Sequence, residues 1–513
     1  MTYNREVLAL DYEKAKKSLG KLQSRKSFIL FISIMLAVSL CLSATSSLMN
    51  SVMIRSSGQI SIPIITAESG YWQDIQAAVD KIVTYGGVGI VYIPEGTWNF
   101  VNVGESWTGA RVVVPAGVNI LGAATERTSG LPYDGVGQNP NGQVIEWKTV
   151  LVIPWDVPGP YEDMPVMFRF VGNGEPDKSS RFSDIKLVGY RSIDPDSTNM
   201  IMGVEIESIV NFRVDHCYFE NIAGGGVSVG YRVETRSLGV VCGVIDHCYF
   251  VNIKGYVEPW VGSCTVQYGV MVYRNSFADL WEEDISKVLG QYTNYSVFIE
   301  DCYFEKWRHC VASNGGAHYV FRHNTIKNDY GQSLDAHGWF MTVCDNPAHG
   351  KVFDPPAVWN GTCWVCGYEV EPGVICGEPL GGQHFKVALL GTRAVEIYNN
   401  EMLDANWTQS ERPNVIQLRG GSGVIFNNVA GGGTYKYLVY LGNEARERPE
   451  GSKVWCNDIW MWNNTLLGGI SLLTKYDPDG QIIEGENYHL HAPHIFNYTP
   501  YPYPHPLTLE ENP

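Results

Sequence analysis

The sequence has too few basic residues for one broad class of function. Its 513 residues include 37 Lys and Arg but 54 Asp and Glu, which gives a formal net charge of −17. Proteins that bind nucleic acid through phosphate contacts carry a surplus of Lys and Arg, so this balance predicts no nucleic-acid partner. Only 18% of the residues are charged, whereas 54 are Gly, 29 are Tyr and 15 are Trp. This composition is typical of a turn-rich β protein rather than of a helical bundle.

Charge is absent from one long stretch near the N-terminus. No charged residue lies between Lys26 and Arg55, and the apolar run FILFISIMLAVSLCL follows a basic segment. We expect residues 1–27 to stay in the cytoplasm and residues 28–54 to form a helix that is either a signal peptide or an uncleaved membrane anchor. Leu42-Ser43-Ala44 is a candidate cleavage site, whereas the long basic segment favours an anchor. Both alternatives predict an extracellular or cell-surface protein.

A repeated template runs through the rest of the chain. Its copies are RVDHCYFENI (213–222), VIDHCYFVNI (244–253), MVYRNSFADL (271–280), FIEDCYFEKW (298–307), VFRHNTIKND (320–329), EIYNNEMLDA (396–405), VIFNNVAGGG (424–433) and WMWNNTLLGG (460–469). Most neighbouring copies start about 22 to 36 residues apart, the range for one coil of a β solenoid. We predict that one aligned column lies inside the coils, at a turn, where Asn bonds the backbone of adjacent coils and Cys fills the same small space. That column consists of Cys217, Cys248, Asn275, Cys302, Asn324, Asn400, Asn428 and Asn464.

The start of this region resembles a known family. IQAAVDKI, GIVYIPEGTW and VVVPAGVNILGA (112–123) are similar to the first coils of the pectate-lyase-like right-handed parallel β-helix proteins, and SLDAHG (333–338) and YTPYPYPHPL (498–507) resemble secreted members. The resemblance implies an all-β fold, a single-stranded right-handed parallel β-helix over residues 65–497 with an N-terminal capping helix. We expect an extended Pro/Tyr-rich tail at 498–513, laid along the last coils. Lyases, hydrolases, epimerases and adhesins share this scaffold, so it implies no single reaction.

SLDAHGWF (333–340) is the stretch that we single out for chemistry. Strand alternation turns Leu334 and Ala336 inward and places Asp335 and His337 together on the outer face. Neighbouring coils would add further polar residues, and Arg322 would bind a uronate carboxylate while His337, oriented by Asp335, acts as base or acid. The predicted catalytic patch consists of His309, His318, Arg322, Asp335, His337 and Glu396. The alternative is that Asp335 orients His337, or bonds a turn, on a solvated face.

Polysaccharide is the partner that this patch predicts. Aromatic rings stack on sugars, and the residues that we expect to bind substrate are Arg308, Trp339, Trp359 and Trp364, although packing within or between coils is the alternative for each Trp. The enzyme hypothesis is a polysaccharide lyase or a glycoside hydrolase. The competing hypothesis is a non-catalytic adhesin or a self-assembling filament subunit. The family resemblance implies calcium with an Arg or Lys base for lyases and Asp pairs for glycosidases, but the chain has no adjacent Asp-Asp.

The sequence also contains candidate disulfide, glycosylation and metal sites. A loop insertion at about 341–384 contains four cysteines, for which we expect disulfides, with a zinc knuckle as the alternative: Cys344, Cys363, Cys366 and Cys376. Eleven of the 12 Cys lie beyond the apolar segment, so at least one should be unpaired or bonded to another molecule. The glycosylation acceptor sites are Asn294, Asn360, Asn406, Asn463 and Asn497. No metal site is assigned; Ca²⁺ is considered at Asp477-Pro478-Asp479-Gly480 with Glu484, where a plain turn is the alternative.

Overall fold

The computed structural model describes residues 62–123, 132–133, 137–138, 146–155, 157, 164–190, 201–230, 240–252, 267–273, 284–290, 296–338, 342–343, 352–353, 391–406, 413–443, 455–478 and 480–509. In this part of the chain no helix is long and apolar enough to cross a membrane. The predictions for residues 1–54, for Asn294 and Asn360, for the four loop cysteines and for Trp339, Trp359 and Trp364 fall outside the described residues and stay predictions.

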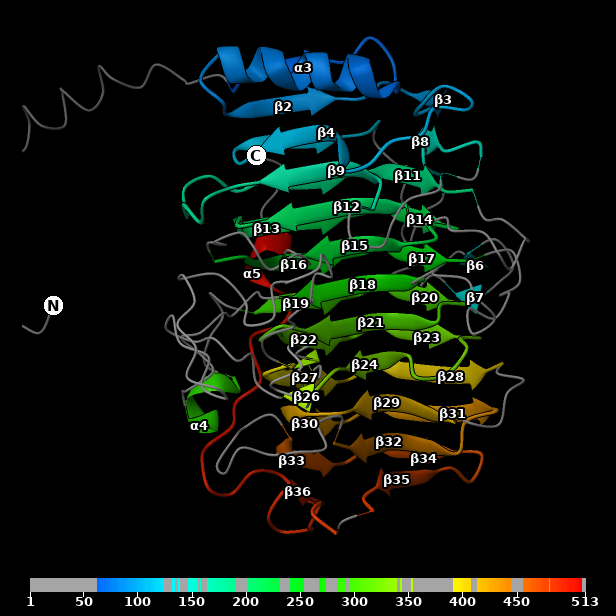
Figure 1. Ribbon diagram of the computed structural model, residues 1–513, viewed down its shortest axis with the longest axis vertical. Coiled ribbons are helices and arrows are strands. Elements are labelled where there is room, and N and C mark those ends of the chain that lie inside the picture. Colours follow the sequence, from blue (N-terminus) through cyan, green and yellow to red (C-terminus); the bar gives the residue numbers. More distant parts are fainter. Residues whose placement is uncertain are drawn as a thin grey trace, which may run out of the picture. The chain divides into compact units, whose positions relative to one another are not determined.

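Three parallel sheets stack the strands of successive coils (Figure 1). Sheet A consists of β1 (Ile64–Thr66), β2 (Gly89–Tyr92), β5 (Val118–Leu121), β10 (Arg181–Ser183), β13 (Val210–Asp215), β16 (Cys242–Asp246), β19 (Val297–Glu300), β22 (His318–Arg322), β27 (Ala394–Tyr398), β30 (Gly421–Phe426), β33 (Cys456–Trp462) and β36 (Tyr488–His489). Sheet B consists of β3 (Gly96–Asn99), β8 (Thr149–Val152), β11 (Ile185–Val188), β14 (Tyr218–Glu220), β17 (Tyr249–Val251), β20 (Tyr303–Glu305), β23 (Thr325–Lys327), β28 (Glu401–Ala405), β31 (Val429–Gly433) and β34 (Thr465–Leu467).

Sheet C closes each coil. Its strands are β4 (Ala110–Pro115), β9 (Val166–Val171), β12 (Met202–Glu207), β15 (Gly225–Val229), β18 (Tyr268–Tyr273), β21 (His309–Asn314), β24 (Leu334–Ala336), β29 (Asn414–Leu418), β32 (Tyr437–Gly442) and β35 (Ser471–Tyr476). Two short antiparallel pairs lie outside the three sheets: β6 (Pro132–Tyr133) with β7 (Gly137–Gln138), and β25 (Thr342–Val343) with β26 (Val352–Phe353). Each complete coil contributes one strand to each main sheet, and β1 and β36 extend sheet A at its two ends, so the predicted single-stranded parallel β-helix is confirmed.

The helix α3 (Trp72–Thr84) covers the first coil, as the sequence predicted. Its buried side chains are Ile75, Ala78, Val79 and Ile82, which the helical spacing of three and four residues places on one face. The helix ends before Gly86 and Gly87, whose φ angles of 111° and 76° favour glycine. This cap shields the apolar end of the coil stack from water.

A left-handed residue makes the turn between sheets A and B. In eight coils this residue has a φ angle between 50° and 60°: Asp184, His216, His247, Asp301, His323, Asn399, Asn427 and Asn463. The residue that follows points into the coil. Cys217, Cys248 and Cys302 are fully buried free thiols in this position, and the Cys217 Sγ donates to the carbonyl of Asp215 at 3.2 Å. Their predicted role in the inner column is therefore confirmed.

Below these cysteines the column becomes an asparagine ladder, formed by Asn324, Asn400, Asn428 and Asn464. The Oδ1 of each Asn accepts from the backbone N–H one rung earlier: 2.9 Å from Asn324 N to Asn400, 3.2 Å from Asn400 N to Asn428 and 3.1 Å from Asn428 N to Asn464. The ladder thus satisfies buried backbone groups at every turn. The eighth copy does not share this register, because Met271–Tyr273 belong to sheet C; the alignment of Asn275, which itself lies outside the described residues, was wrong.

The outer face of sheet A is covered by two segments. One is the short helix α4 (Ile285–Val288); the other is residues 496–509, here called the C-terminal strap, which ends in α5 (Pro506–Leu509). The strap places Phe496 against Trp460 of β33, Tyr501 against Phe298 of β19 and the Leu507 carbonyl on the Arg213 guanidinium of β13. It thus reaches well beyond the last coils on which we expected it to lie.

The asparagine ladder gives a stability prediction. Asn400→Ala removes donors to the carbonyls of Phe321 and Tyr398 and leaves Asn324 N without its acceptor, which should lower the free energy of unfolding by about 2–4 kcal/mol. Asn400→Cys should cost less, because the equivalent position accommodates Cys in three other coils. Denaturant unfolding of both variants is the measurement, and equal losses would contradict a role for the column beyond filling space.

Candidate functional site

The structure divides the predicted catalytic patch between two faces of the coil. His309, Asp335 and His337 lie on or next to sheet C, whereas His318, Arg322 and Glu396 belong to sheet A. His318 follows His309 by only nine residues, but the chain turns a corner between β21 and β22. The prediction of one continuous patch is therefore wrong, because nearness in sequence across a corner does not place two side chains on the same face.

Strand register builds the sheet C group. Ala312, Asp335 and Gln417 are in register on β21, β24 and β29, and Leu334 and Ala336 point into the core. His337 is the first residue after β24, and Arg419 is the first residue after β29. Both side chains therefore lie at the ends of their strands, beside Asp335. The sheet C cluster is defined as His309, Asp335, His337 and Arg419.

Asp335 is the centre of this cluster. Arg419 binds both of its oxygens, with Nε to Oδ1 at 3.1 Å and Nη2 to Oδ2 at 2.7 Å, and His337 Nε2 lies 3.2 Å from Oδ2. Burial alone would raise the pKa of Asp335, which is 2% exposed, but the guanidinium of Arg419, together with the neighbouring imidazoles of His337 and His309, holds that pKa well below its ordinary value. Asp335 therefore points outward as predicted, yet it is a buried anion and not a solvated one.

The two histidines of the cluster differ in access. Burial lowers the pKa of His309 to about 3, and its Nδ1 donates to the Gln332 carbonyl at 2.5 Å, so this ring is neutral at physiological pH. The side chains of His337 and Arg419 are 13% and 22% exposed. His337 Nε2–H can donate to Asp335 in both protonation states, and in the neutral ring Nδ1 can then accept from Arg419 Nη2 at 2.7 Å. Both protonation states of His337 thus have a partner, as a general acid or base requires.

On sheet A, Glu396 is bound on every side. His318 Nε2 lies 3.1 Å from Oε1, the Gly290 backbone N donates to Oε1 at 2.9 Å and the Tyr498 hydroxyl donates to Oε2 at 2.7 Å. Glu396 and His318 have no exposed surface, and Tyr498 belongs to the C-terminal strap. This group joins β22, β27, the strap and the region of α4, so its arrangement is that of a structural network.

Arg322 is also buried beneath the strap. It pairs with Glu300 at 2.6 Å and donates to the carbonyl of Tyr501 at 2.9 Å. Neither member of the pair has exposed surface. We predicted that the Arg322 guanidinium binds the carboxylate of a uronate sugar. In the structure this guanidinium is instead paired with the Glu300 carboxylate of the same chain.

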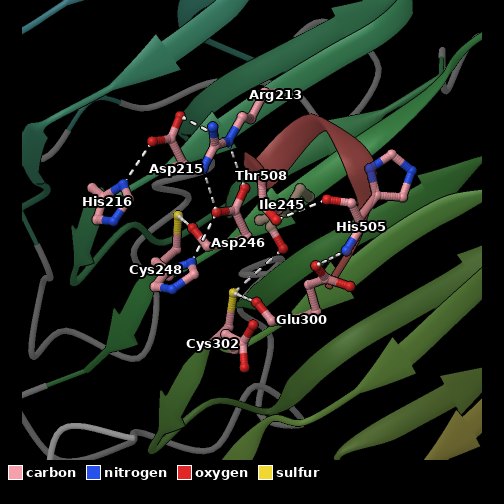
Figure 2. Close-up of polar contacts among 12 residues, drawn as sticks. Arg213, Asp215, His216, Ile245, Asp246, Cys248, Glu300, Cys302, His505 and Thr508 are labelled. Carbon is pink, nitrogen blue, oxygen red and sulfur yellow. Dashed lines mark hydrogen bonds and ion pairs between the residues drawn. The ribbon is translucent and has the colours of Figure 1, made fainter. Parts of the chain in front are cut away.

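The same face carries ion pairs that sequence reasoning missed. Figure 2 shows Arg213 and Asp246 of adjacent strands facing the strap residues His505 and Thr508. Arg213 binds both oxygens of Asp246 at 2.9 Å, and Asp215 accepts from Arg181 at 2.7 Å and from His216 at 2.6 Å. The repeat did contain a sign of these ion pairs. In four successive coils the residue before the left-handed turn is charged: Asp215, Asp246, Glu300 and Arg322.

A second polar group on sheet C was also missed. Arg169 of β9 lies 2.5 Å from Glu205 and 3.3 Å from Glu207, two carboxylates that alternate with the inward Ile206 of β12. Four strand spacings separate β12 from β24, which corresponds to about 19 Å at about 4.8 Å per spacing. The sequence MGVEIE shows the alternation but gives no sign of the partner.

The remaining predicted residues have varied surroundings. Arg308 is partly exposed and lies over the Tyr268 ring at 5.6 Å, beside His309. Asp477 accepts from the backbone N–H groups of Gln481 and Ile482 and lies 3.8 Å from Lys475, the contacts of a turn. Asn406, Asn463 and Asn497 are exposed, which is compatible with glycosylation.

Comparison with protein-family models and with the sequences of curated proteins gives no match. Solved structures that resemble the chain include an alginate lyase from Paenibacillus sp. (9% identity over 80% of this chain and 97% of that one, TM-score 0.34). They also include a tailspike of E. coli bacteriophage HK620 in complex with a pentasaccharide (15%, 79% and 55%, TM-score 0.37) and the surface adhesin PfbA of Streptococcus pneumoniae (12%, 80% and 92%, TM-score 0.33). What they share with this chain is the right-handed parallel β-helix fold.

The sheet A network makes Arg322 a structural residue. Arg322→Ala leaves the Glu300 carboxylate buried without its cation and should lower the free energy of unfolding by about 3–5 kcal/mol. The double variant Arg322→Met with Glu300→Leu should recover much of that loss, because it removes both charges. Denaturant unfolding compares the three proteins; a stable Arg322→Ala protein that fails only in ligand binding would contradict this assignment.

Burial of neutral His309 predicts a pH dependence. Its folded pKa of about 3 lies below the ordinary value of 6.5, so the unfolded chain binds the extra proton between these values. This residue should therefore destabilise the fold as the pH falls from 6.5 towards 3, by up to about 1.4 kcal/mol per pH unit. His309→Gln should give a shallower loss of stability between pH 7 and pH 4 in denaturant unfolding. An unchanged slope would show that His309 does not remain neutral.

Proposed function

We propose that this chain is an exported β-helix protein that binds an acidic polysaccharide on sheet C and cleaves it by elimination. The observation that supports the proposal is the graded exposure of the sheet C cluster, in which the anion Asp335 is buried while the side chains of His337 and Arg419 reach the surface. An imidazole held by a buried carboxylate is suited to proton transfer. A guanidinium next to it is suited to a sugar carboxylate.

Elimination is favoured over hydrolysis by the positions of the carboxylates. Glycoside hydrolysis generally uses two carboxyl groups about 5 to 9.5 Å apart. The described strands of sheet C carry only Glu205, Glu207 and Asp335, and Asp335 is about 19 Å from the other two along the sheet. Asp335 is also paired with Arg419, which leaves it unsuited to donate a proton.

The proposed step uses His337 as the base. Neutral His337 takes the proton from the carbon next to the uronate carboxylate, the released electron pair forms a carbon–carbon double bond, and the bond to the glycosidic oxygen breaks. That oxygen leaves with a proton, which the imidazolium can return. Asp335 stabilises the imidazolium, and Arg419 offsets the negative charge that develops on the carboxylate.

Export is part of the same proposal. The basic residues 1–27 and the apolar residues 28–54 would insert into a membrane and leave the β-helix outside, either anchored or released. Exposed Asn406, Asn463 and Asn497 are compatible with this location.

A polysaccharide panel tests the reaction. The full-length protein should release unsaturated products from a polymer rich in uronate, and His337→Ala should lower the rate by at least about 100-fold. Arg419→Lys should weaken substrate binding more than it slows a bound substrate. The matched control is His323→Asn, which removes an imidazole at a left-handed turn that holds Asn in the next three coils.

Each of the other outcomes would favour a different function or a different site. New reducing ends without unsaturation would contradict elimination and favour hydrolysis. Binding to the polymer without any cleavage, or polymerisation of the protein itself, would favour the adhesin or filament alternative. Cleavage that His337→Ala leaves unchanged would show that the sheet C cluster is not the site.

A further inference from the structure

A histidine cluster lies at the last coil, where the chain leaves sheet A. His489 is the final residue of β36, and His491 and His494 follow in the sequence His489-Leu490-His491-Ala492-Pro493-His494. The ring centroids of His489 and His491 are 5.5 Å apart, and those of His491 and His494 are 4.9 Å apart. The rings are tilted by 48° and 54° and not stacked on one another.

Each of these two spacings fits a pair of imidazoles on one metal ion. A zinc–nitrogen bond of about 2.0–2.1 Å places a ring centroid about 3.2 Å from the metal, so two rings at a tetrahedral angle have centroids about 5.2 Å apart. The two measured separations lie on either side of this value. From this geometry we propose that His489, His491 and His494 bind a divalent transition metal of the zinc class, with water completing the coordination.

Two of the rings already have surroundings typical of ligands. His491 Nδ1 donates to the Ala492 carbonyl at 2.8 Å, which leaves Nε2 with the free electron pair; metal-binding histidines commonly make such an outer bond. His489 pairs in register with Trp460 and stacks on its ring at 5.3 Å, so its orientation is fixed.

Closing the site requires rotation of the rings. Among the residues that the structure describes, no three His, Cys, Asp or Glu side chains already converge as a ligand set. His491 and His494 are exposed, and the terminal torsion of a histidine is broad, so turning these rings costs little. Pro493 restricts the backbone between them. A bound ion would join β36 to the segment that leads into the C-terminal strap and would close the open end of the coil stack.

Calorimetric titration of the full-length protein in detergent with ZnCl₂ tests the site. We expect the protein to bind zinc, and we expect His491→Ala to weaken that binding at least about tenfold. A tenfold loss is the smallest effect expected when even a hydrogen-bond partner of a metal ligand is removed. His494→Ala should do the same, and His323→Asn should not. Zinc should also raise the unfolding temperature of the parent protein but not that of His491→Ala.

Cobalt spectra separate this site from the cysteines elsewhere in the chain. Co²⁺ bound by imidazoles lacks the charge-transfer bands of a thiolate, so the signal lost in His491→Ala should be one without those bands. Zinc binding of unchanged affinity in both His491→Ala and His494→Ala would overturn the proposal. So would a cobalt spectrum with thiolate bands alone. These readouts do not depend on polysaccharide cleavage, so the metal site and the proposed reaction can fail separately.

Discussion

The left-handed turn between sheets A and B is the constraint on which the rest of the molecule depends. In the eight coils that have this turn, the chain changes direction within two residues, which leaves backbone polar groups facing the interior. The asparagine ladder satisfies them with side chains, since Asn400 accepts from Asn324 N above and donates to the carbonyls of Phe321 and Tyr398. Because this bonding fixes the register of each coil on the next, it also fixes which outer residues become neighbours on sheets A and C.

The strand register places charged side chains in a column on the outer face of sheet A, where they need oppositely charged and hydrogen-bonding partners. Asp215, Asp246, Glu300 and Arg322 follow one another in register on β13, β16, β19 and β22, and acids on adjacent strands repel unless cations lie between them. Arg181 and Arg213 supply cations on one side, and the C-terminal strap seals the column with its own carbonyl, hydroxyl and backbone N–H groups. The strap therefore completes the hydrogen bonding of the coils, besides covering their apolar surface.

Local sequence patterns predicted the structure of a coil but not which side chains share an outer face of the coil stack. The capping helix, the buried cysteines and the asparagine ladder follow from spacing within one or two coils, and all three are present. The division of His309 from His318 could not be read from the repeat, because a corner between β21 and β22 separates them. Partners that arrive from distant segments are equally hidden: Arg419 lies 84 residues beyond Asp335, and the Tyr501 carbonyl lies 179 residues beyond Arg322. Composition and period carry no information on such pairs.

The contrast between the two faces is the reason for assigning the proposed chemistry to sheet C. On sheet A the His318–Glu396 and Arg322–Glu300 pairs have no exposed surface, so a substrate would have to displace the strap and leave buried charges unpaired. In the sheet C cluster Asp335 is the buried anion, and the groups that it orients become more accessible from His337 to Arg419. An incoming carboxylate can approach Arg419 without breaking the pair that holds Asp335 ionised, because a guanidinium has five donors. The same buried anion can therefore stabilise the fold and hold the imidazole in place for proton transfer.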